Sequence, residues 1–297
     1  MTTAYIGRFA PSPTGPLHFG SLVAAMGSYL EAKSQSGRWL LRIEDLDPPR
    51  EVAGAGESII RTLDALGFEW DGSITYQSQR TELYLHALDK FARDGATFRC
   101  ACSRRQLAAQ QIYPGTCRYL NLREKSTSIR LRVTGKIDFV DSIQGNCSET
   151  LERECGDFVV RRRDGLFAYQ LAVVVDDADQ DITHVVRGAD LLENTARQIF
   201  LQRQLAVSTP QYCHLPVAIN KHGEKLSKQT FAPAIEKFSP PAALRSAWEF
   251  LGQTNIDASV VDTGEFWQRA LALWDINRVP KKPALPCDGF TVPKARL

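Results

Sequence analysis

Two loops of this sequence carry residue types that suit a nucleotide. The first is the Pro/Gly-punctuated segment Pro11–Ser21 (PSPTGPLHFGS), which lies between a predicted strand and a predicted helix. A helix N-terminus offers unpaired N–H groups and a partial positive charge, and both suit phosphate. His18 adds a hydrogen-bond donor at this edge, and Gly20 lets a ring or a phosphate approach the backbone. On this segment alone, a proline-rich loop with a surface histidine is an equally good interpretation.

The second loop, residues 220–229 (NKHGEKLSKQ), holds three lysines together with Gly223 and Ser227. A mobile cationic loop of this kind can follow the charge that moves during phosphoryl or adenylyl transfer. Lys225 and Lys228 are the lysines that we expect to contribute. Taken by itself, such a loop is more often a solvated lysine-rich turn.

Three thiols and a phenol lie close together in the sequence. Cys100, Cys102 and Cys117 belong to one short segment, and Tyr113 precedes the last of them. A structural zinc ion takes four ligands in a tetrahedron, usually thiolate or imidazole, so the cysteines leave one ligand missing. Tyr113 is the local candidate, although phenolate is an uncommon ligand that must lose its proton near the metal. The alternative is three reduced thiols in an ordinary loop, and the other four cysteines show no partner spacing.

The N-terminal segment 1–70 predicts a strand–helix–strand–helix order that positions the first loop. A strand at residues 4–10 precedes the loop, and a helix that begins near Ser21 ends at Gly37. A second strand at residues 38–47 ends in acidic residues, and a second helix covers residues 54–66. This order predicts a parallel α/β sheet with its functional groups at the carboxyl ends of the strands.

The remainder of the chain predicts further helices and strands. A hairpin is expected at residues 157–177, with Asp164 and Gly165 as its turn, and its apolar stretch 171–177 (LAVVVDD) is expected to be a buried strand. Ser239 and Pro240 are expected to begin a helix that ends at Leu251. The other expected elements are helices at 80–94, 191–205 and 264–275, strands at 129–133 and 137–141, and an extended basic tail at 279–297.

Composition excludes several classes of protein. The 297 residues suggest about two domains, and 43% hydrophobic with 24% charged residues is ordinary for a globular chain. The net charge of +2 excludes a histone-like cationic protein, but not a local basic patch for nucleic acid. Apolar runs are too short to cross a membrane, and no signal peptide is expected. Seven cysteines, an odd number, predict reduced thiols in a cytoplasmic protein.

Five segments, in order, resemble class I aminoacyl-tRNA synthetases and most closely the glutamyl-tRNA synthetase family: GRFAPSPTGPLHFGS, LRIEDLDPPR, LFAYQLAVVVDD, VVRGADLL and KLSKQ. The resemblance covers residues 5–240 or so and implies a Rossmann-like catalytic domain that uses ATP with Mg²⁺. It implies that His18 and Gly20 hold ATP and that Lys228 contacts its phosphates, with Lys225 beside it. The loop reads KLSKQ where the class pattern is KMSKS, and both lysines and the serine are kept.

The glutamate that this family activates brings one ammonium and two carboxylate groups, so its pocket needs one acid and at least two donors. Glu44, at the end of the second strand, is suited to the ammonium, and Arg8 and Arg187 to the carboxylates. Tyr169 can donate a hydroxyl, and the family resemblance adds Ser12. We expect Arg8, Glu44, Tyr169 and Arg187 to lie on the sheet.

Some charged residues keep two interpretations. Asp45 and Asp47 are expected to do no more than fix Arg42 or Arg50. The run Arg161–Arg163 is as well explained by solvation as by contact with an RNA backbone.

The resemblance also implies a division of the chain. Residues 1–96 and 166–238 would form the two halves of the catalytic domain, and residues 97–165 an inserted α+β subdomain. Residues 239–297 would form a short helical extension. The C-x-C…Y-x-x-x-C pattern resembles a zinc site in the acceptor-binding insertion of short paralogues in this family. The ligands would be Cys100, Cys102, Tyr113 and Cys117.

The segment that follows Lys228, residues 229–297, is one that we expect to be too short for the anticodon-binding domain of a full glutamyl-tRNA synthetase. The resemblance to short paralogues implies that L-glutamate is activated with ATP and transferred to the cyclopentenediol of queuosine, at the wobble position of tRNA(Asp). A monomer is expected. Two alternatives stay open. One is a truncated enzyme that charges the 3′ end of tRNA(Glu), and the other is a non-catalytic paralogue that binds tRNA.

Overall fold

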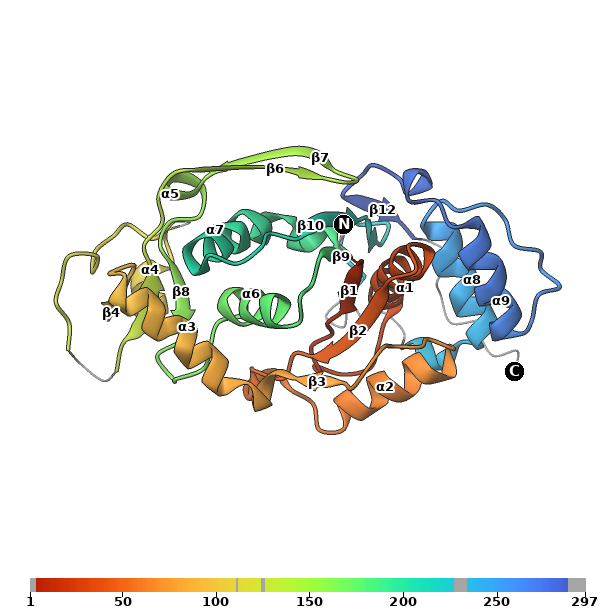
Figure 1. The fold of residues 1–297 in the computed structure, drawn as a ribbon, viewed down its shortest axis with the longest axis horizontal. Coiled ribbons are helices and arrows are strands. Elements are labelled where there is room, and N and C mark those ends of the chain that lie inside the picture. The colour runs from red at the N-terminus through yellow and green to blue at the C-terminus, as the bar shows by residue number, and fades with distance from the viewer. Residues whose placement is uncertain (1–3, 111, 124–125, 227–233, 288–297) are drawn as a thin grey trace.

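The computed structural model describes residues 4–110, 112–123, 126–226 and 234–287. A parallel sheet runs through the middle of the molecule (Figure 1). It is made of two parts that meet where the backbone N–H of Thr183 donates to the carbonyl of Ile6 at 2.9 Å. The predicted parallel α/β sheet is therefore confirmed. Its strands are β1 (Ile6–Phe9), β2 (Arg38–Ile43), β3 (Thr75–Tyr76), β9 (His184–Gly188) and β10 (Gln211–Leu215).

Helices cover both faces of this sheet and enclose two hydrophobic cores. Alternate residues of β2 point to opposite faces, so Trp39 and Leu41 enter one core while Leu40 enters the other. The first core is shared by α1 (Phe19–Ser34), α2 (Ala55–Ala65), α8 (Pro240–Phe250) and α9 (Thr263–Leu273). The second is shared by α3 (Thr81–Arg93), α6 (Tyr169–Asp179) and α7 (Thr195–Leu205).

The expected buried strand at residues 171–177 is wrong, because this stretch is part of helix α6. Leu171 to Val174 are all buried, and a short apolar run buried on every side has no period that separates a strand from a helix. The predicted turn before it is confirmed. Gly165 has a φ of +90°, and Phe167 bridges back to Arg161 at the end of β8 (Phe158–Arg161). Tyr169 therefore lies at a helix N-terminus and not on the sheet.

The segment between the two halves of the sheet forms its own antiparallel structure. Strands β4 (Thr97–Cys100) and β8 flank β5 (Ser128–Leu131), and two short helices accompany them. A long hairpin then returns toward the parallel sheet (Figure 1), where Asp141 pairs with Tyr212 of β10. The remaining elements are α4 (Arg104–Leu107), β6 (Lys136–Asp141), β7 (Gly145–Thr150) and α5 (Leu151–Glu154).

The C-terminal part packs on the first half of the chain. The proline predicted to open α8 does so at Pro240, although the side chain of Ser239 makes no capping hydrogen bond. Part of the predicted tail is a strand, because β12 (Ala284–Pro286) pairs with β11 (Val217–Ile219), whereas residues 288–297 lie outside the described residues. Across the described ranges, no helix is both long and apolar enough to cross a bilayer. Short 3-10 turns occur at Pro48–Arg50, Gln77–Gln79, Ala189–Asn194, Ile235–Lys237 and Ile276–Arg278.

Replacement of Trp267 tests whether α9 belongs to the first core of the parallel sheet. Its indole N–H donates to the carbonyl of Leu66 at 2.8 Å, and its ring packs on Tyr29 and Phe68. Trp267→Ala should lower the free energy of unfolding by about 3–5 kcal/mol, because it removes a large buried side chain. The exposed Arg269→Ala on the same helix should change it by no more than about 0.5 kcal/mol. Equal urea midpoints for the two variants would contradict this packing.

Candidate active site and cysteine cluster

A cavity of about 910 Å³ lies over the carboxyl ends of β1, β2, β9 and β10. Its walls include both predicted nucleotide loops and the predicted amino-acid pocket. Lys228 lies outside the described residues, as does the rest of the segment 227–233. The other predicted residues of the catalytic, glutamate and ATP sites all line this one cavity: Arg8, Ser12, His18, Gly20, Glu44, Tyr169, Arg187 and Lys225.

The two loops adjoin at the mouth of the cavity. His18 is the N-cap of α1, and its side chain accepts from the backbone N–H of Ser21. A Cβ placed on Gly20 would lie 3.6 Å from the carbonyl oxygen of Leu226, so a larger residue would narrow the space between the loops. Lys225 forms an ion pair with Asp190, which also lines the cavity. The two loops, which belong to opposite halves of the sequence, therefore face one cavity.

Buried charges form the floor of the cavity. Asp177 of α6 accepts from Arg8 through Nε at 3.1 Å and Nη2 at 3.3 Å, and from Arg42 through Nη2 at 2.7 Å. These three side chains are almost completely buried. Nη1 of Arg8 has no hydrogen-bond partner within the described part of the chain, so this arginine retains donors for a ligand. Arg42, by contrast, is fully buried and serves to position its acidic neighbours.

Glu44 lies beside this network but is poorly satisfied by it. Its buried Oε1 makes no hydrogen bond to any described residue, and the nearest cation, Nη2 of Arg42, is 3.5 Å away. Burial raises the pKa of Glu44 to about 7, and the charges of Arg42 and Arg8 offset only part of that effect. A buried carboxylate without a hydrogen bond is costly. The arrangement therefore favours a cationic ligand group at this position.

Arg187 is the most extensively bonded side chain in the cavity. All five of its N–H groups have protein acceptors, and the longest of these hydrogen bonds is the one to the Tyr169 hydroxyl. A ligand carboxylate at Arg187 must therefore share or replace that hydrogen bond. The acceptors are His214 Nε2 (2.9 Å), Gln198 Oε1 (2.8 Å), Tyr169 OH (3.4 Å), Thr195 Oγ1 (3.0 Å) and the carbonyl of Leu191 (3.2 Å).

The two other acidic residues near the second strand differ from each other. Asp47 pairs with Arg50, as expected, and also with Arg162 at 2.8 Å. Asp45 contacts neither expected arginine, and instead accepts from the backbone N–H of Ser78 at 2.8 Å and from its hydroxyl at 2.6 Å. Both carboxylates therefore position neighbouring segments.

The run Arg161–Arg163 is engaged within the protein. Each guanidinium has an intramolecular acceptor, so the run is not fully solvated, while contact with an RNA backbone stays a prediction. The acceptors are the carbonyl of Gly165 for Arg161, the carboxylates of Asp47 and Asp164 for Arg162, and the carbonyls of Ala101 and Cys102 for Arg163.

Sequence reasoning missed three residues of the cavity and its support: Asp177, Asp190 and His214. Asp177 follows an apolar run, and a buried charge after such a run needs a partner, which was the available signal. Asp190 comes shortly after Gly188, the last residue of β9, where a short acidic residue can meet a lysine loop. His214 is a lone histidine between buried residues, and its spacing carries no signal.

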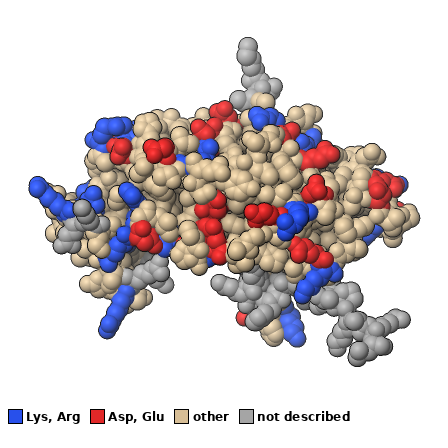
Figure 2. Space-filling view, turned by 90° about the horizontal axis from the view of Figure 1, so that it is seen from below, with Lys and Arg blue, Asp and Glu red and all other residues tan. Residues whose placement is uncertain are grey.

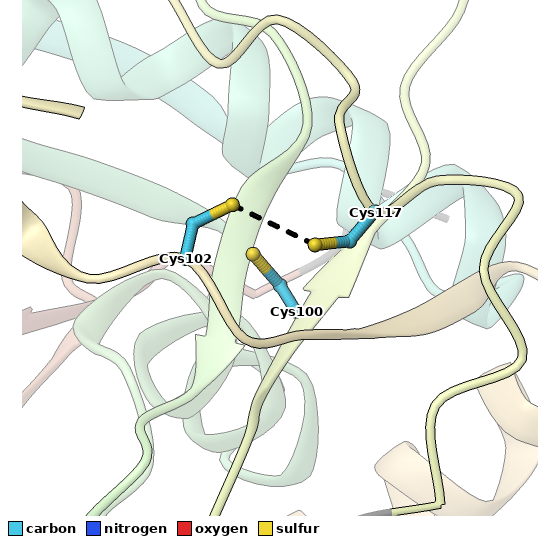
Figure 3. A group of neighbouring side chains, drawn as sticks. All are labelled: Cys100, Cys102 and Cys117. Atoms are coloured by element: carbon cyan, nitrogen blue, oxygen red, sulfur yellow. Dashed lines mark hydrogen bonds between the residues drawn. The ribbon is translucent and has the colours of Figure 1, made fainter. Parts of the chain in front are cut away.

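The predicted zinc ligands also lie close together, within the inserted segment. Cys100 ends β4, and its sulfur lies within 4.8 Å of the sulfur atoms of Cys102 and Cys117. Figure 3 shows the three sulfur atoms turned toward one another, with Cys102 and Cys117 3.6 Å apart. The Tyr113 hydroxyl is 3.5 Å from the sulfur of Cys100 and accepts from the backbone N–H of Cys117 at 2.7 Å.

The electrostatics of the cluster favour a thiolate at Cys100. Burial opposes its ionisation, but hydrogen bonds from Tyr113 and Arg130 outweigh burial and lower the pKa of this thiol to about 7. Burial and the neighbouring thiols raise the pKa of Cys102 to about 11, and burial raises that of Tyr113 above its usual range. Metals bind the thiolate form, so this donor set fits a thiophilic cation that deprotonates the remaining ligands.

Comparison with known proteins agrees with this geometry. A family model described as tRNA synthetases class I (E and Q), catalytic domain, matches residues 6–113 and 109–239. A protein named glutamyl-Q tRNA(Asp) synthetase from Photobacterium profundum is 52% identical over 285 residues, which covers 94% of this chain and 91% of that protein. Its namesake from Dechloromonas aromatica is 52% identical over 294 residues, covering 95% of this chain and 98% of that protein.

Solved structures share the fold. The glutamate-tRNA synthetase of Elizabethkingia anophelis has a TM-score of 0.79 at 24% identity, over 96% of this chain and 68% of that one. The glutamate tRNA ligase of Elizabethkingia meningosepticum, solved in complex with its amino acid, has a TM-score of 0.79 at 25% identity, over 97% and 67%. The chain therefore belongs to the class I tRNA synthetases of the E and Q type, and its curated relatives in that family are named glutamyl-Q tRNA(Asp) synthetases.

Proposed function

We propose that the protein activates L-glutamate with ATP and transfers it to queuosine at the wobble position of tRNA(Asp). The observation that carries this proposal is the cavity in which a buried, unsatisfied carboxylate and two buried arginines meet both nucleotide loops. Relatives at about 50% identity, matched over 91–99% of their own lengths, are named for this tRNA. ATP and L-glutamate are thus the small substrates, and tRNA(Asp) is the macromolecular partner.

The floor of the cavity complements free glutamate. The ammonium group would pair with the Glu44 carboxylate, whose Oε1 makes no hydrogen bond to any described residue and lies 3.5 Å from Nη2 of Arg42. The carboxylates would take the open donors of Arg8 and the Nη1 group of Arg187, where the hydrogen bond to Tyr169 is long enough to be shared. Ser12 would close the site from the first loop. One acid and two arginines then match one cation and two anions.

The two loops would hold ATP above the amino acid. The N–H groups that begin α1, together with His18, suit phosphate oxygens, and Gly20 leaves room for the nucleotide. Lys225 lies at the rim, and we assign Lys228 to the phosphates from its place in the KLSKQ motif. Mg²⁺ would accompany the phosphates. A carboxylate oxygen of glutamate attacks the α-phosphorus of ATP, pyrophosphate leaves, and glutamyl-adenylate forms.

Transfer requires a nucleophilic hydroxyl next to the adenylate. One hydroxyl of the queuosine cyclopentenediol would attack the glutamyl carbonyl, form the ester and release AMP. This cis-diol is chemically similar to the ribose diol at the 3′ end of a tRNA, so a site built for one can accept the other.

The inserted segment has the charge that an RNA partner requires. Residues 97–132 contain eight Lys and Arg and one Glu, whereas the whole chain has a net charge of only +2. Lys and Arg side chains are prominent at this end of the molecule in Figure 2. The Tyr119 side chain is 88% exposed, and an exposed ring of this kind can stack on an unpaired base. These features support the contact of this segment with the anticodon loop.

We further propose that Cys100, Cys102, Tyr113 and Cys117 hold one structural Zn²⁺. Three sulfur atoms within 4.8 Å and an adjacent hydroxyl fit a closed tetrahedral set. Bound zinc would order the loop that carries Tyr119, and it would supply no catalytic position.

The tRNA target is tested with labelled glutamate and two preparations of tRNA(Asp), from cells able and unable to make queuosine. We expect transfer to the first preparation, none to the second and none to tRNA(Glu). Equal labelling of both tRNA(Asp) preparations, or labelling of tRNA(Glu), would favour the enzyme that charges a 3′ end. Absence of glutamate-dependent pyrophosphate exchange would instead favour a non-catalytic paralogue.

Glu44→Gln should weaken glutamate binding while it stabilises the fold. The loss of a buried charge partner predicts an increase of about 100-fold in the KM for glutamate in pyrophosphate exchange. Because burial raises the pKa of Glu44 to about 7, the ionised side chain costs stability above that pH. The variant should therefore gain about 1–3 kcal/mol at pH 8, and this gain should disappear as the pH falls below about 5. The exposed Glu57→Gln should show neither effect, and a destabilised Glu44→Gln at pH 8 would count against this assignment.

Cys100→Ser should abolish zinc binding, because one of three thiolate ligands is lost. Elemental analysis should find about one zinc per wild-type chain and none in the variant. Transfer to tRNA should fall much more than pyrophosphate exchange, since the cluster lies in the inserted segment. Cys147→Ser, outside the cluster on β7, should keep the metal. Metal-free wild-type protein with full transfer activity would end the zinc proposal.

A further inference from the structure

A chain of three buried side chains leads from the inserted hairpin to the glutamate pocket. Oδ2 of Asp141, at the end of β6, lies 2.6 Å from Nδ1 of His214 on β10, and both side chains are completely buried. Nε2 of the same imidazole accepts from Nε of Arg187 at 2.9 Å. Asp141 and His214 do not line the cavity, so neither can touch a substrate there.

The hydrogen bonds determine which nitrogen of His214 carries the proton. Oδ1 of Asp141 accepts from the backbone N–H groups of Ile143, Gln144 and His214, which favours the ionised carboxylate. Although burial opposes its ionisation, these bonds and His214 hold the pKa of Asp141 below its usual range. Nδ1 of His214 must then donate to Oδ2, and Nε2 keeps a lone pair for Arg187. Burial also lowers the pKa of His214, which keeps the ring neutral.

We propose that Asp141 and His214 are positioning residues of the glutamate site, which fix the guanidinium of Arg187 through the Nδ1–H form of the imidazole. This inference rests on the proposed role of Arg187 in glutamate binding. Nε is the one donor of Arg187 that faces an imidazole, and together with the hydrogen bonds to Gln198 and Thr195 it fixes the guanidinium plane beside Tyr169. Asp141 belongs to the inserted hairpin, so this segment contributes directly to the geometry of the amino-acid pocket.

Asp141→Asn should move the proton of His214 from Nδ1 to Nε2, with little change in the shape of the side chain at position 141. The amide oxygen can still accept from the three backbone N–H groups, so the turn after β6 is kept. The amide N–H₂ faces Nδ1 and forces the proton onto Nε2, where it opposes the Nε–H of Arg187 and faces the Thr195 hydroxyl at 3.3 Å. We expect the KM for glutamate to rise about 10–100-fold, with the KM for ATP changed less than about twofold. Asp138→Asn, on the exposed face of the same strand, should change neither constant.

Two comparisons separate positioning from a general structural role. In an Arg187→Lys background the contact with His214 is already lost, so Asp141→Asn should add little to the KM for glutamate. His214→Gln can place an amide oxygen near the position of Nε2, whereas His214→Asn can place an amide N–H near that of Nδ1. We therefore expect a smaller KM increase for Gln than for Asn, even though Asn retains the hydrogen bond to Asp141. A purely structural role predicts the reverse order.

The experiment measures glutamate and ATP dependence of pyrophosphate exchange for these variants, with thermal unfolding midpoints alongside. A KM for glutamate unchanged by Asp141→Asn, or raised equally with and without Arg187, would overturn the inference. If Asp141→Asn does not fold, the order of the two His214 variants decides the matter. An Arg187→Lys variant with a normal KM for glutamate would instead contradict the proposed pocket, so the two failures are distinguishable.

Discussion

The floor of the cavity depends on the ion pairs that the Asp177 carboxylate forms with two arginines. This carboxylate joins helix α6 to β1 through Arg8 and to β2 through Arg42, and the residues that it connects are far apart in the chain. Breaking a buried pair of this kind leaves an uncompensated charge, which is strongly destabilising. Glu44 lies next to the same arginines, whose charge is already shared with Asp177. The two arginines therefore offset only part of the effect of burial on Glu44, and its pKa is raised. A cationic ligand group beside Glu44 would stabilise the ionised carboxylate.

The inserted segment contacts the rest of the molecule near the cavity at two places. At the first, β6 reaches the catalytic sheet and delivers Asp141 to His214. At the second, neighbouring arginines after β8 point to different partners. Arg162 lines the cavity and pairs with Asp47, while Arg163 donates to the carbonyl of Ala101 beside the cysteine cluster. The cysteine cluster and the proposed amino-acid pocket are thus connected through short, directional contacts.

The parts of this structure that could be predicted are those fixed by neighbours in sequence. The helix after the first loop follows from the spacing of its apolar residues, and the cysteine cluster follows from four candidate ligands in one short segment. The predicted strand at 171–177 is wrong because Leu171 to Val174 of α6 are all buried, and such a run has no exposed position that reveals its period. The partners of Arg8 and His214 lie 169 and 73 residues away, and no local pattern specifies such pairs. For the same reason the sequence predicts the wrong partner for Asp45, because its actual partner, Ser78, follows a different strand.

In the proposed complex, glutamate binds with its ammonium group at the buried carboxylate of Glu44. Calorimetric titration of glutamate in buffers of different ionisation enthalpy measures the protons exchanged on binding. Free Glu44, with a pKa of about 7, is partly protonated at neutral pH, and an ammonium partner should lower that pKa. Binding near pH 7 should release a fraction of a proton, this release should disappear at pH 8.5, and Glu44→Gln should abolish it. Binding with no linked proton at pH 7, or with the same release in Glu44→Gln, would contradict this arrangement.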